Sequence, residues 1–449
     1  MKRVVITGLG AITPVGNDVS SFWNSLTSGK CGIGPITKFD TEDYKVKIAA
    51  EVKDFDPLKY MEKSETRRQD VFAQYAFAAA AQAMQDSGLS TGGGVAQCRM
   101  DAPEANIAPE RLGVYIGSGT GGMGTFMAEA QKILENGPRK VSPFFVPMMI
   151  GNMATGNVAI QFGAQGPTLP VVTACATSTN AIGEAFRAVK HGYADAVIAG
   201  GAEATVLPLA MAGFTNCMAL TLRNEPQAAS IPFDKRRDGF VLGEGAAVVI
   251  LEEYEHAKAR GAKMYGEIIG YGNTCDAYHM TAPHPEGLCA ARAISEALLE
   301  AGISTGIDGQ KAVLIKEADG DVIPAGAVYF NAHGTSTPLN DKTETKAIKT
   351  ALGEEIAKKI HVSSTKSMTG HMLGAAGAIE AIATVLALQD GIVPPTIGYQ
   401  EPDPECDLDI TPNISVKADL ELGISSSLGF GGHNGCLVFQ RLSQKNRTK

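Results

Sequence analysis

The sequence predicts an α/β fold made of two copies of one unit, and two observations support this. Short apolar runs that suit buried strands alternate with stretches of helical periodicity along the chain. The order of features also repeats. Each half has a helix, a glycine stop, a polar insert and a strand ending in small residues, in AAAAQAMQDSGLS to GVYIGSGTGG and in ARAISEALLEAGIS to AVYFNAHGTST. We therefore predict two halves, residues 1–257 and 258–449.

The individual elements follow from these patterns. The apolar runs predict strands at Val4–Thr7, Gly113–Gly117, Thr168–Thr173, Ala196–Ala199, Ala246–Leu251, Glu267–Ile269, Val328–Asn331, His361–Ser364, Gly423–Ser426 and Cys436–Phe439. Helical periodicity predicts long helices at Val71–Ser87, Asn180–Lys190, Leu288–Ala301 and Ala376–Leu388. Two polar inserts, near 91–108 and 305–326, contain the turn-rich runs TGGG and EADGDVIPAG, so we expect exposed surface loops there.

The bulk composition indicates a cytoplasmic protein that neither binds nucleic acid nor crosses a membrane. The 449-residue chain has a formal net charge of -9, whereas nucleic-acid-binding proteins are usually basic. The most apolar long window, GAAGAIEAIATVLAL, is too short for a bilayer and is interrupted by Glu380. The start, MKRVVITGLG, is typical of a strand and not of a signal peptide. The cysteines form no CxxC pair, so we expect free thiols and no metal site.

The stretch VVTACATSTN, residues 171–180, places Cys175 where a strand gives way to a helix. A helix N-terminus offers free N–H groups and a positive dipole end, which favour a thiolate and could stabilise an oxyanion. A small buried structural cysteine explains the local sequence equally well.

Two histidines make a reactive site more credible. His333 follows a strand in NAHGTSTP, and His371 precedes a helix in TKSMTGHMLGAAG. Strand ends are where α/β folds place reactive groups, although a single histidine there is more often structural. Lys366 and Glu380 flank His371 and predict an ion pair, either semi-buried or on a helix face. GSGTGG, 117–122, matches a dinucleotide-binding pattern but lacks the acidic residue about 20 positions later, so no such cofactor is expected.

Four motifs together, TACATSTNAIGEA, NAHGTSTPLND, SSTKSMTGHMLGAAGAIEA and SLGFGGHNG, resemble the β-ketoacyl-acyl-carrier-protein synthases, most of all the type II synthases. The resemblance covers nearly the whole chain apart from the two inserts. It implies the thiolase-type fold, an internally duplicated α/β unit in five layers, and usually a homodimer. It also implies an acyltransferase of fatty acid biosynthesis that condenses malonyl and acyl groups carried on the phosphopantetheine of an acyl-carrier protein, with no metal or redox cofactor.

The resemblance assigns roles to individual residues. Cys175 becomes the acyl-accepting nucleophile, and His333, His371 and Lys366 become its catalytic partners. The remaining positions are Phe430, Gly429 and Gly431 for the oxyanion hole and a gate, Thr335 and Thr337 for pantetheine, Glu380, Asp341 and Glu344 for supporting charges, Thr120 and Phe214 for the acyl pocket, and Arg67, Arg68 and Arg139 for the carrier protein.

Departures from the family and three rival functions bear on these roles. Thr120 stands where an isoleucine often lines the acyl pocket, so chain-length preference is open. Met218 stands where an arginine is common, which predicts a thinner basic patch for the carrier protein. A thiolase would need a second reactive cysteine, for which Cys436 is the only nearby candidate, and a non-catalytic chain-length partner would lack Cys175. A polyketide ketosynthase shares the core motifs and remains an alternative.

Overall fold

One large sheet forms the frame of the molecule in the computed structural model, which describes residues 1–95, 104–308, 311–318 and 320–442. Within these ranges, nine strands pair in the order β12-β11-β15-β16-β7-β1-β6-β5-β4. Their bounds are β1 (Val4–Ile12), β4 (Leu112–Gly117), β5 (Ala196–Glu203), β6 (Gly245–Glu253), β7 (Gly266–Cys275), β11 (Val328–Asn331), β12 (His361–Ser363), β15 (Leu422–Gly429) and β16 (His433–Gln440).

The sheet repeats one pattern of strand directions. In the first half β4 runs parallel to β5, while β5 with β6 and β6 with β1 are antiparallel. In the second half β11 runs parallel to β15, while β15 with β16 and β16 with β7 are antiparallel. The two copies join where β1 pairs with β7. The predicted division after residue 257 falls inside helix α10 (Tyr254–Ala259), and its position stays a prediction.

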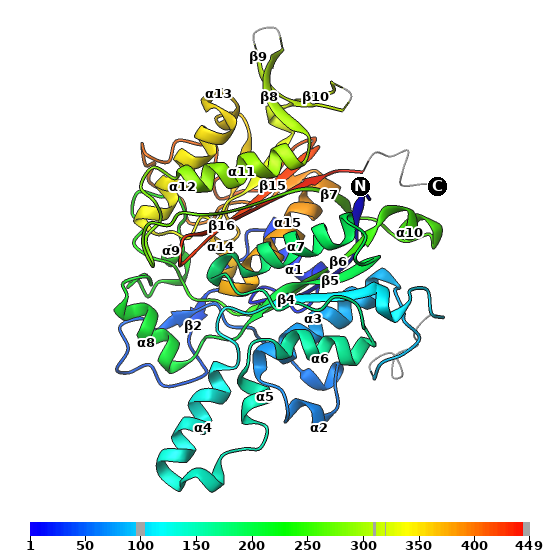
Figure 1. Cartoon of the computed structure of the whole chain (residues 1–449). Helices are drawn as coiled ribbons and strands as arrows, with labels where there is room; N and C mark the ends of the chain where they lie inside the picture. The colour runs from blue at the N-terminus through cyan, green and yellow to red at the C-terminus, as the bar shows by residue number, and fades with distance from the viewer. Residues whose placement is uncertain (96–103, 309–310, 319, 443–449) are drawn as a thin grey trace.

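Helices form three layers around and between the two halves of the sheet (Figure 1). In the middle, α7 (Thr177–Lys190) contacts β4, β5 and β6 on one side and β7 and β16 on the other, and α15 (Ala376–Asp390) likewise contacts both halves. The outer layers are α3 (Val71–Ser87) with α6 (Met153–Phe162), and α11 (Leu288–Glu300) with α12 (Pro338–Leu352). This is the five-layer α/β order that the resemblance implied.

The central position of α15 explains its composition. A helix between two sheet halves has no solvent-facing side, so it is apolar all round. The helical stretch Leu373–Asp390 is long and apolar enough to cross a membrane by composition alone, but 89% of it is buried inside the protein. It is therefore a core helix, and its burial, not the short length expected from the sequence, accounts for its apolar composition.

Local signals set the ends of the predicted helices. Helix α3 follows Asp70, whose carboxylate accepts the Phe72 N–H, and it ends at Gly88 in the left-handed region, φ +65°. The predicted bounds Val71–Ser87 and Val328–Asn331 agree with α3 and β11 to the residue.

Two predicted elements differ from the structure. The prediction of a strand at Thr168–Thr173 is wrong. Only Thr168 pairs with the sheet, through a single bridge to Val114. This segment runs along the outer edge of β4, where the described chain offers no strand on its other side. The insert near 305–326 was expected to be a loop, but β8 (Ile303–Asp308), β9 (Lys311–Lys316) and β10 (Val322–Pro324) form a small antiparallel sheet. Buried Val313, Leu314 and Ile323 hold it together.

The first insert is described only in part. Residues 96–103 lie outside the described ranges. The described parts, 91–95 and 104–108, contain no helix or strand, in agreement with the predicted loop.

Candidate active site

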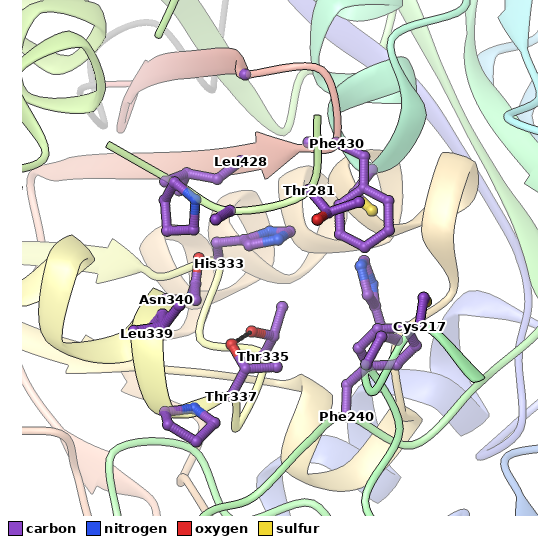
Figure 2. A pocket seen from close by; sticks show the side chains of 18 of the residues that line it. Cys217, Phe240, Thr281, His333, Thr335, Thr337, Leu339, Asn340, Leu428 and Phe430 are labelled. Atoms are coloured by element: carbon purple, nitrogen blue, oxygen red, sulfur yellow. Dashed lines mark hydrogen bonds between the residues drawn. The ribbon is translucent and has the colours of Figure 1, made fainter. Parts of the chain in front are cut away.

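One cavity of about 360 Å³ collects seven of the predicted site residues, including the cysteine and both histidines. Its lining includes Cys175, His333, His371, Thr335, Thr337, Gly429 and Phe430. Figure 2 shows His333 and Phe430 facing the same space, with the hydrogen-bonded pair Thr335 and Thr337 on another wall, their hydroxyl oxygens 3.0 Å apart. Residues from both copies of the fold therefore meet at one site.

A strained turn presents Cys175 to the cavity. Cys175 lies in a short 3₁₀ turn, Ala174–Ala176, which leads directly into α7. Ala174 has φ +50°, a left-handed conformation that is costly for a residue with a side chain. The second copy repeats this turn at Leu373–Ala375 before α15, with Leu373 at φ +46° and Gly374 in the place that Cys175 occupies. The two turns contact each other.

Burial dominates the acidity of Cys175. Desolvation raises the pKa of the thiol to about 12, while Lys366 and the Phe430 backbone N–H, which hydrogen-bonds the sulfur, lower it. Burial thus outweighs the thiolate-favouring effect expected at a helix start, and the resting group is a thiol. Gly429 lets its strand lie close to the Cys175 turn, because a Cβ there would lie 2.7 Å from the Thr173 carbonyl oxygen and 3.2 Å from the Cys175 nitrogen.

His333 is held as a neutral hydrogen-bond donor. Its Nδ1 lies 3.3 Å from Lys366 Nζ. Because an ammonium group can only donate, Nδ1 accepts and the ring proton is left on Nε2. Burial and the charge of Lys366 hold the pKa of His333 well below its usual range. Glu344 fixes the loop behind it by accepting the His333 and Gly334 backbone N–H groups at 2.7 and 2.8 Å.

His371 has unused hydrogen-bonding capacity. Its ring meets His333 and Phe240 edge-on, with centroids 5.2 and 5.1 Å apart. The side chain is 1% exposed, yet neither ring nitrogen has a hydrogen-bond partner among the described residues. Burial and Lys366 hold the pKa of His371 well below its usual range. Leaving a buried polar group unpaired costs stability, so a ligand atom is the natural partner of this ring.

We expect neither histidine to titrate during catalysis at neutral pH. Since both pKa values lie well below 6.5, the pH profile of kcat/KM should show no ionisation of these rings near neutrality. ¹⁵N NMR of the labelled histidines should likewise show two rings that stay neutral across that range. An inflection near pH 6.5 that disappears in a His371 variant would contradict this.

Lys366 and Glu380 form a fully buried pair behind His333. Lys366 Nζ hydrogen-bonds Glu380 Oε1, and both side chains are 1% exposed. Burial raises the pKa of Glu380 to about 7, against the lowering effect of Lys366. The pair is therefore an internal ion pair and not one on a helix surface, the two alternatives left by the sequence.

Glu344 and Asp341 serve the backbone of neighbouring loops. Glu344 also accepts the Ser426 hydroxyl at 2.6 Å. Asp341 accepts the Phe233 backbone N–H at 2.8 Å and lies 3.7 Å from the Arg237 guanidinium. Both carboxylates are buried.

Several predicted site residues do not line the cavity as the structure describes it. The Thr120 hydroxyl donates to Glu203 at 2.7 Å, and the Phe214 ring packs edge-on against Phe240 in the apolar cluster that contains Cys175. Gly431, at φ +84°, donates its N–H to the Met280 carbonyl at 2.7 Å. The three arginines predicted to bind the carrier protein are exposed. Arg67 and Arg68 lie beside α2 (Lys63–Thr66), and Arg139 lies in the turn Pro138–Lys140. The predicted roles of all six stay untested.

The sequence did not reveal Glu203, which lies fully buried at the end of β5. Its carboxylate accepts the N–H groups of Gly119, Thr120 and Gly374 and the hydroxyls of Ser118 and Thr120. The glycine-rich loop that resembles a dinucleotide site therefore binds a carboxylate of its own chain. The available signal was an acidic residue closing the apolar strand AVIAGGAE.

Similarity to known proteins agrees with this geometry. Residues 1–257 match the N-terminal domain of β-ketoacyl synthases, and residues 265–400 match the C-terminal domain. The 3-oxoacyl-[acyl-carrier-protein] synthase 2 of Synechocystis sp. is 49% identical over 441 residues, 98% of both chains.

Solved structures agree as well. A β-ketoacyl synthase from Burkholderia phymatum superimposes with a TM-score of 0.85 at 33% identity, covering 99% of this chain and 100% of that one. A type II polyketide ketosynthase in complex with its acyl-carrier protein, bound to the hexaketide, gives a TM-score of 0.83 at 34% identity, covering 98% and 100%. With the duplicated five-layer fold and the cysteine–histidine cavity, these matches establish that the chain belongs to the β-ketoacyl synthase family of condensing acyltransferases, with the thiolase-like fold.

Proposed function

We propose that Cys175 carries the acyl group in a decarboxylative condensation that lengthens fatty acyl chains by two carbons, with His333 and His371 stabilising the enolate. The observation that carries this proposal is one buried cavity that holds a thiol and two neutral imidazoles, one of them with no partner for its ring nitrogens among the described residues. Family membership supplies the reaction, and the geometry supports these roles.

In the first half-reaction the Cys175 sulfur attacks an acyl thioester on the carrier protein. The carbonyl oxygen becomes an oxyanion, and the backbone N–H groups of Cys175 and Phe430 are the available donors. The thiol loses its proton, the pantetheine sulfur leaves and takes up a proton, and the acyl group remains on Cys175. The Cys175 thiol does not need a lowered pKa before the reaction, because its proton can leave while the sulfur attacks.

In the second half-reaction malonyl thioester loses CO₂ and leaves an enolate. Its oxygen needs donors that are already in place, and His333 Nε2–H is oriented by Lys366 for this purpose. A proton-bearing nitrogen of His371 is the second donor. The enolate carbon then bonds to the acyl carbonyl carbon, and the Cys175 sulfur leaves and takes up a proton from water, which restores the resting thiol as the β-ketoacyl thioester forms.

The rival functions fit the molecule less well. Cys436, the candidate second thiolase cysteine, is fully buried in β16 and is not among the residues that line the cavity within the described chain. A non-catalytic partner would have no use for the Cys175 site. The polyketide alternative is less supported, because identity is 49% to the type 2 fatty-acid synthase and 34% to the polyketide ketosynthase.

We also infer a cytoplasmic homodimer that acts with an acyl-carrier protein. The edge segment beyond β4 exposes Leu169 and Val172, 45% and 58% exposed, and the outer edge of this segment has no strand partner within the described chain. Pairing with the same segment of a second copy would cover these side chains. Sedimentation should give a particle of twice the 46.9 kDa chain mass, and Val172→Glu should shift it toward the single chain. A monomeric wild type would refute this.

The proposed function is tested by intact mass after mixing the protein with a panel of acyl-carrier proteins. We expect one acyl adduct per chain, mapped by peptide analysis to Cys175, and the chain that loads best will define specificity. Cys436→Ala is the matched control and should load like the wild type. If the wild-type protein accepts an acyl group from none of these carrier proteins, the proposed function is contradicted.

A further inference from the structure

The mouth of the cavity carries exposed apolar side chains. Met218 and Leu339 both line the cavity, and they are 87% and 52% exposed. Figure 2 places Leu339 and Cys217, the neighbour of Met218, on opposite sides of the space. We propose that Met218 and Leu339 form an apolar rim on which the body of the acyl-carrier protein docks, an inference that rests on the proposed function. The pantetheine arm has to enter this cavity to reach Cys175, so the carrier body must cover its mouth.

Met218 is unfavourable in the free protein for two reasons. Its φ of +57° is a left-handed conformation that suits glycine or asparagine, and its long apolar side chain is almost fully in water. It follows the end of α8 (Pro208–Asn216), where its N–H donates to the Thr215 carbonyl. A strained and exposed apolar residue at a cavity mouth is more readily explained by a binding partner than by folding.

Charge at the mouth does not favour an acidic partner. Two acidic residues, Asp238 and Asp276, line the cavity. Arg223 lies 3.5 Å from Asp238 and donates to the Arg236 carbonyl at 2.6 Å, so its charge is largely compensated. Attraction between the rim and a carrier protein must therefore come mainly from apolar burial, with any basic contact made farther away.

The test compares two kinds of substrate. One is hexanoyl and malonyl groups on an acyl-carrier protein of fatty acid synthesis, and the other is the same groups as N-acetylcysteamine thioesters, which lack a protein body. Met218→Asn keeps a residue that tolerates the left-handed turn, and Leu339→Gln keeps the helix start. The matched control is Ile414→Asn, because Ile414 is 75% exposed and is not among the residues that line the cavity in the described chain.

We expect each rim variant to raise KM for carrier-bound substrate about tenfold, with Ile414→Asn unchanged and N-acetylcysteamine turnover unchanged in all three. Wild-type KM should vary little between about 50 and about 300 mM salt. Unchanged KM in both rim variants, or a steep salt dependence, would overturn the proposal. Equal loss with both kinds of substrate would also overturn it, because the rim would then act on the site itself. Wild-type turnover of the thioesters reports the proposed function separately.

Discussion

Cys175→Ala should abolish the acyl-enzyme and lower condensation by at least about 10⁴-fold, because a nucleophile that acts in a coupled set cannot be replaced by the remaining groups. The same variant should still release CO₂ from malonyl-carrier protein. That step uses the two imidazoles and does not require the thiol. Intact mass and ¹⁴CO₂ release measure the two half-reactions separately.

The histidine variants should show the reverse pattern. His333→Ala and His371→Ala remove one enolate donor each and should each lower decarboxylation about 10²- to 10³-fold, while Cys175 still accepts an acyl group. Loss of both half-reactions in every variant would show that the cavity does not divide its chemistry in this way. Thermal unfolding of each variant separates such a loss from misfolding.

Lys366→Met should destabilise the protein by about 3–5 kcal/mol, because it leaves the Glu380 carboxylate buried without its cation. It should also impair condensation, since the contact that keeps the His333 proton on Nε2 is lost. Chemical denaturation gives the stability, and kcat gives the catalytic loss.

The stability loss in Lys366→Met should depend on pH. Burial already raises the pKa of Glu380 from 4.5 to about 7 in the presence of Lys366, and removing the cation raises it further. A carboxyl group with a raised folded-state pKa stabilises the fold when protonated and loses that contribution as pH rises through the folded pKa. The variant should therefore be closer to wild type near about pH 5 than near about pH 8. Lys366→Met combined with Glu380→Met should regain stability without regaining activity, and a double variant as unstable as the single one would contradict this.

Much of the fold could be read from the sequence because periodicity and turn chemistry are local. Helix α3 has a capping aspartate and a closing glycine, and β11 is a short apolar run, so both bounds were predicted to the residue. The strand expected at Thr168–Thr173 pairs with β4 at Thr168 alone, and whether a segment pairs along its whole length depends on the path of the neighbouring chain, which local sequence cannot show. The small sheet near 305–326 was missed because its apolar residues are short runs inside turn-rich sequence.

The site was predictable in its members but not in its electrostatics. The motifs identified Cys175, His333 and His371 as a set, and the structure places all three on one cavity. Which ring nitrogen of His333 holds the proton depends on Lys366, and the thiol of Cys175 stays neutral because of burial. The position of the His333 proton and the neutrality of the Cys175 thiol are both properties of three-dimensional packing. Glu203 escaped notice because its donors come from a loop 85 residues away at Ser118 and from Gly374 in the other copy.

The glycine at position 374 makes the two copies of the fold permanently unequal. A Cβ at Gly374 would lie 2.6 Å from the Gly119 nitrogen and 2.7 Å from Glu203 Oε2, so no side chain fits there while the loops stay where they are. A cysteine therefore does not fit at position 374, either in place of Cys175 or in addition to it. The backbone keeps the symmetry of the two copies, but under the mechanism proposed above only one of the two turns in each chain can hold an acyl group, while the second copy supplies His333 and His371.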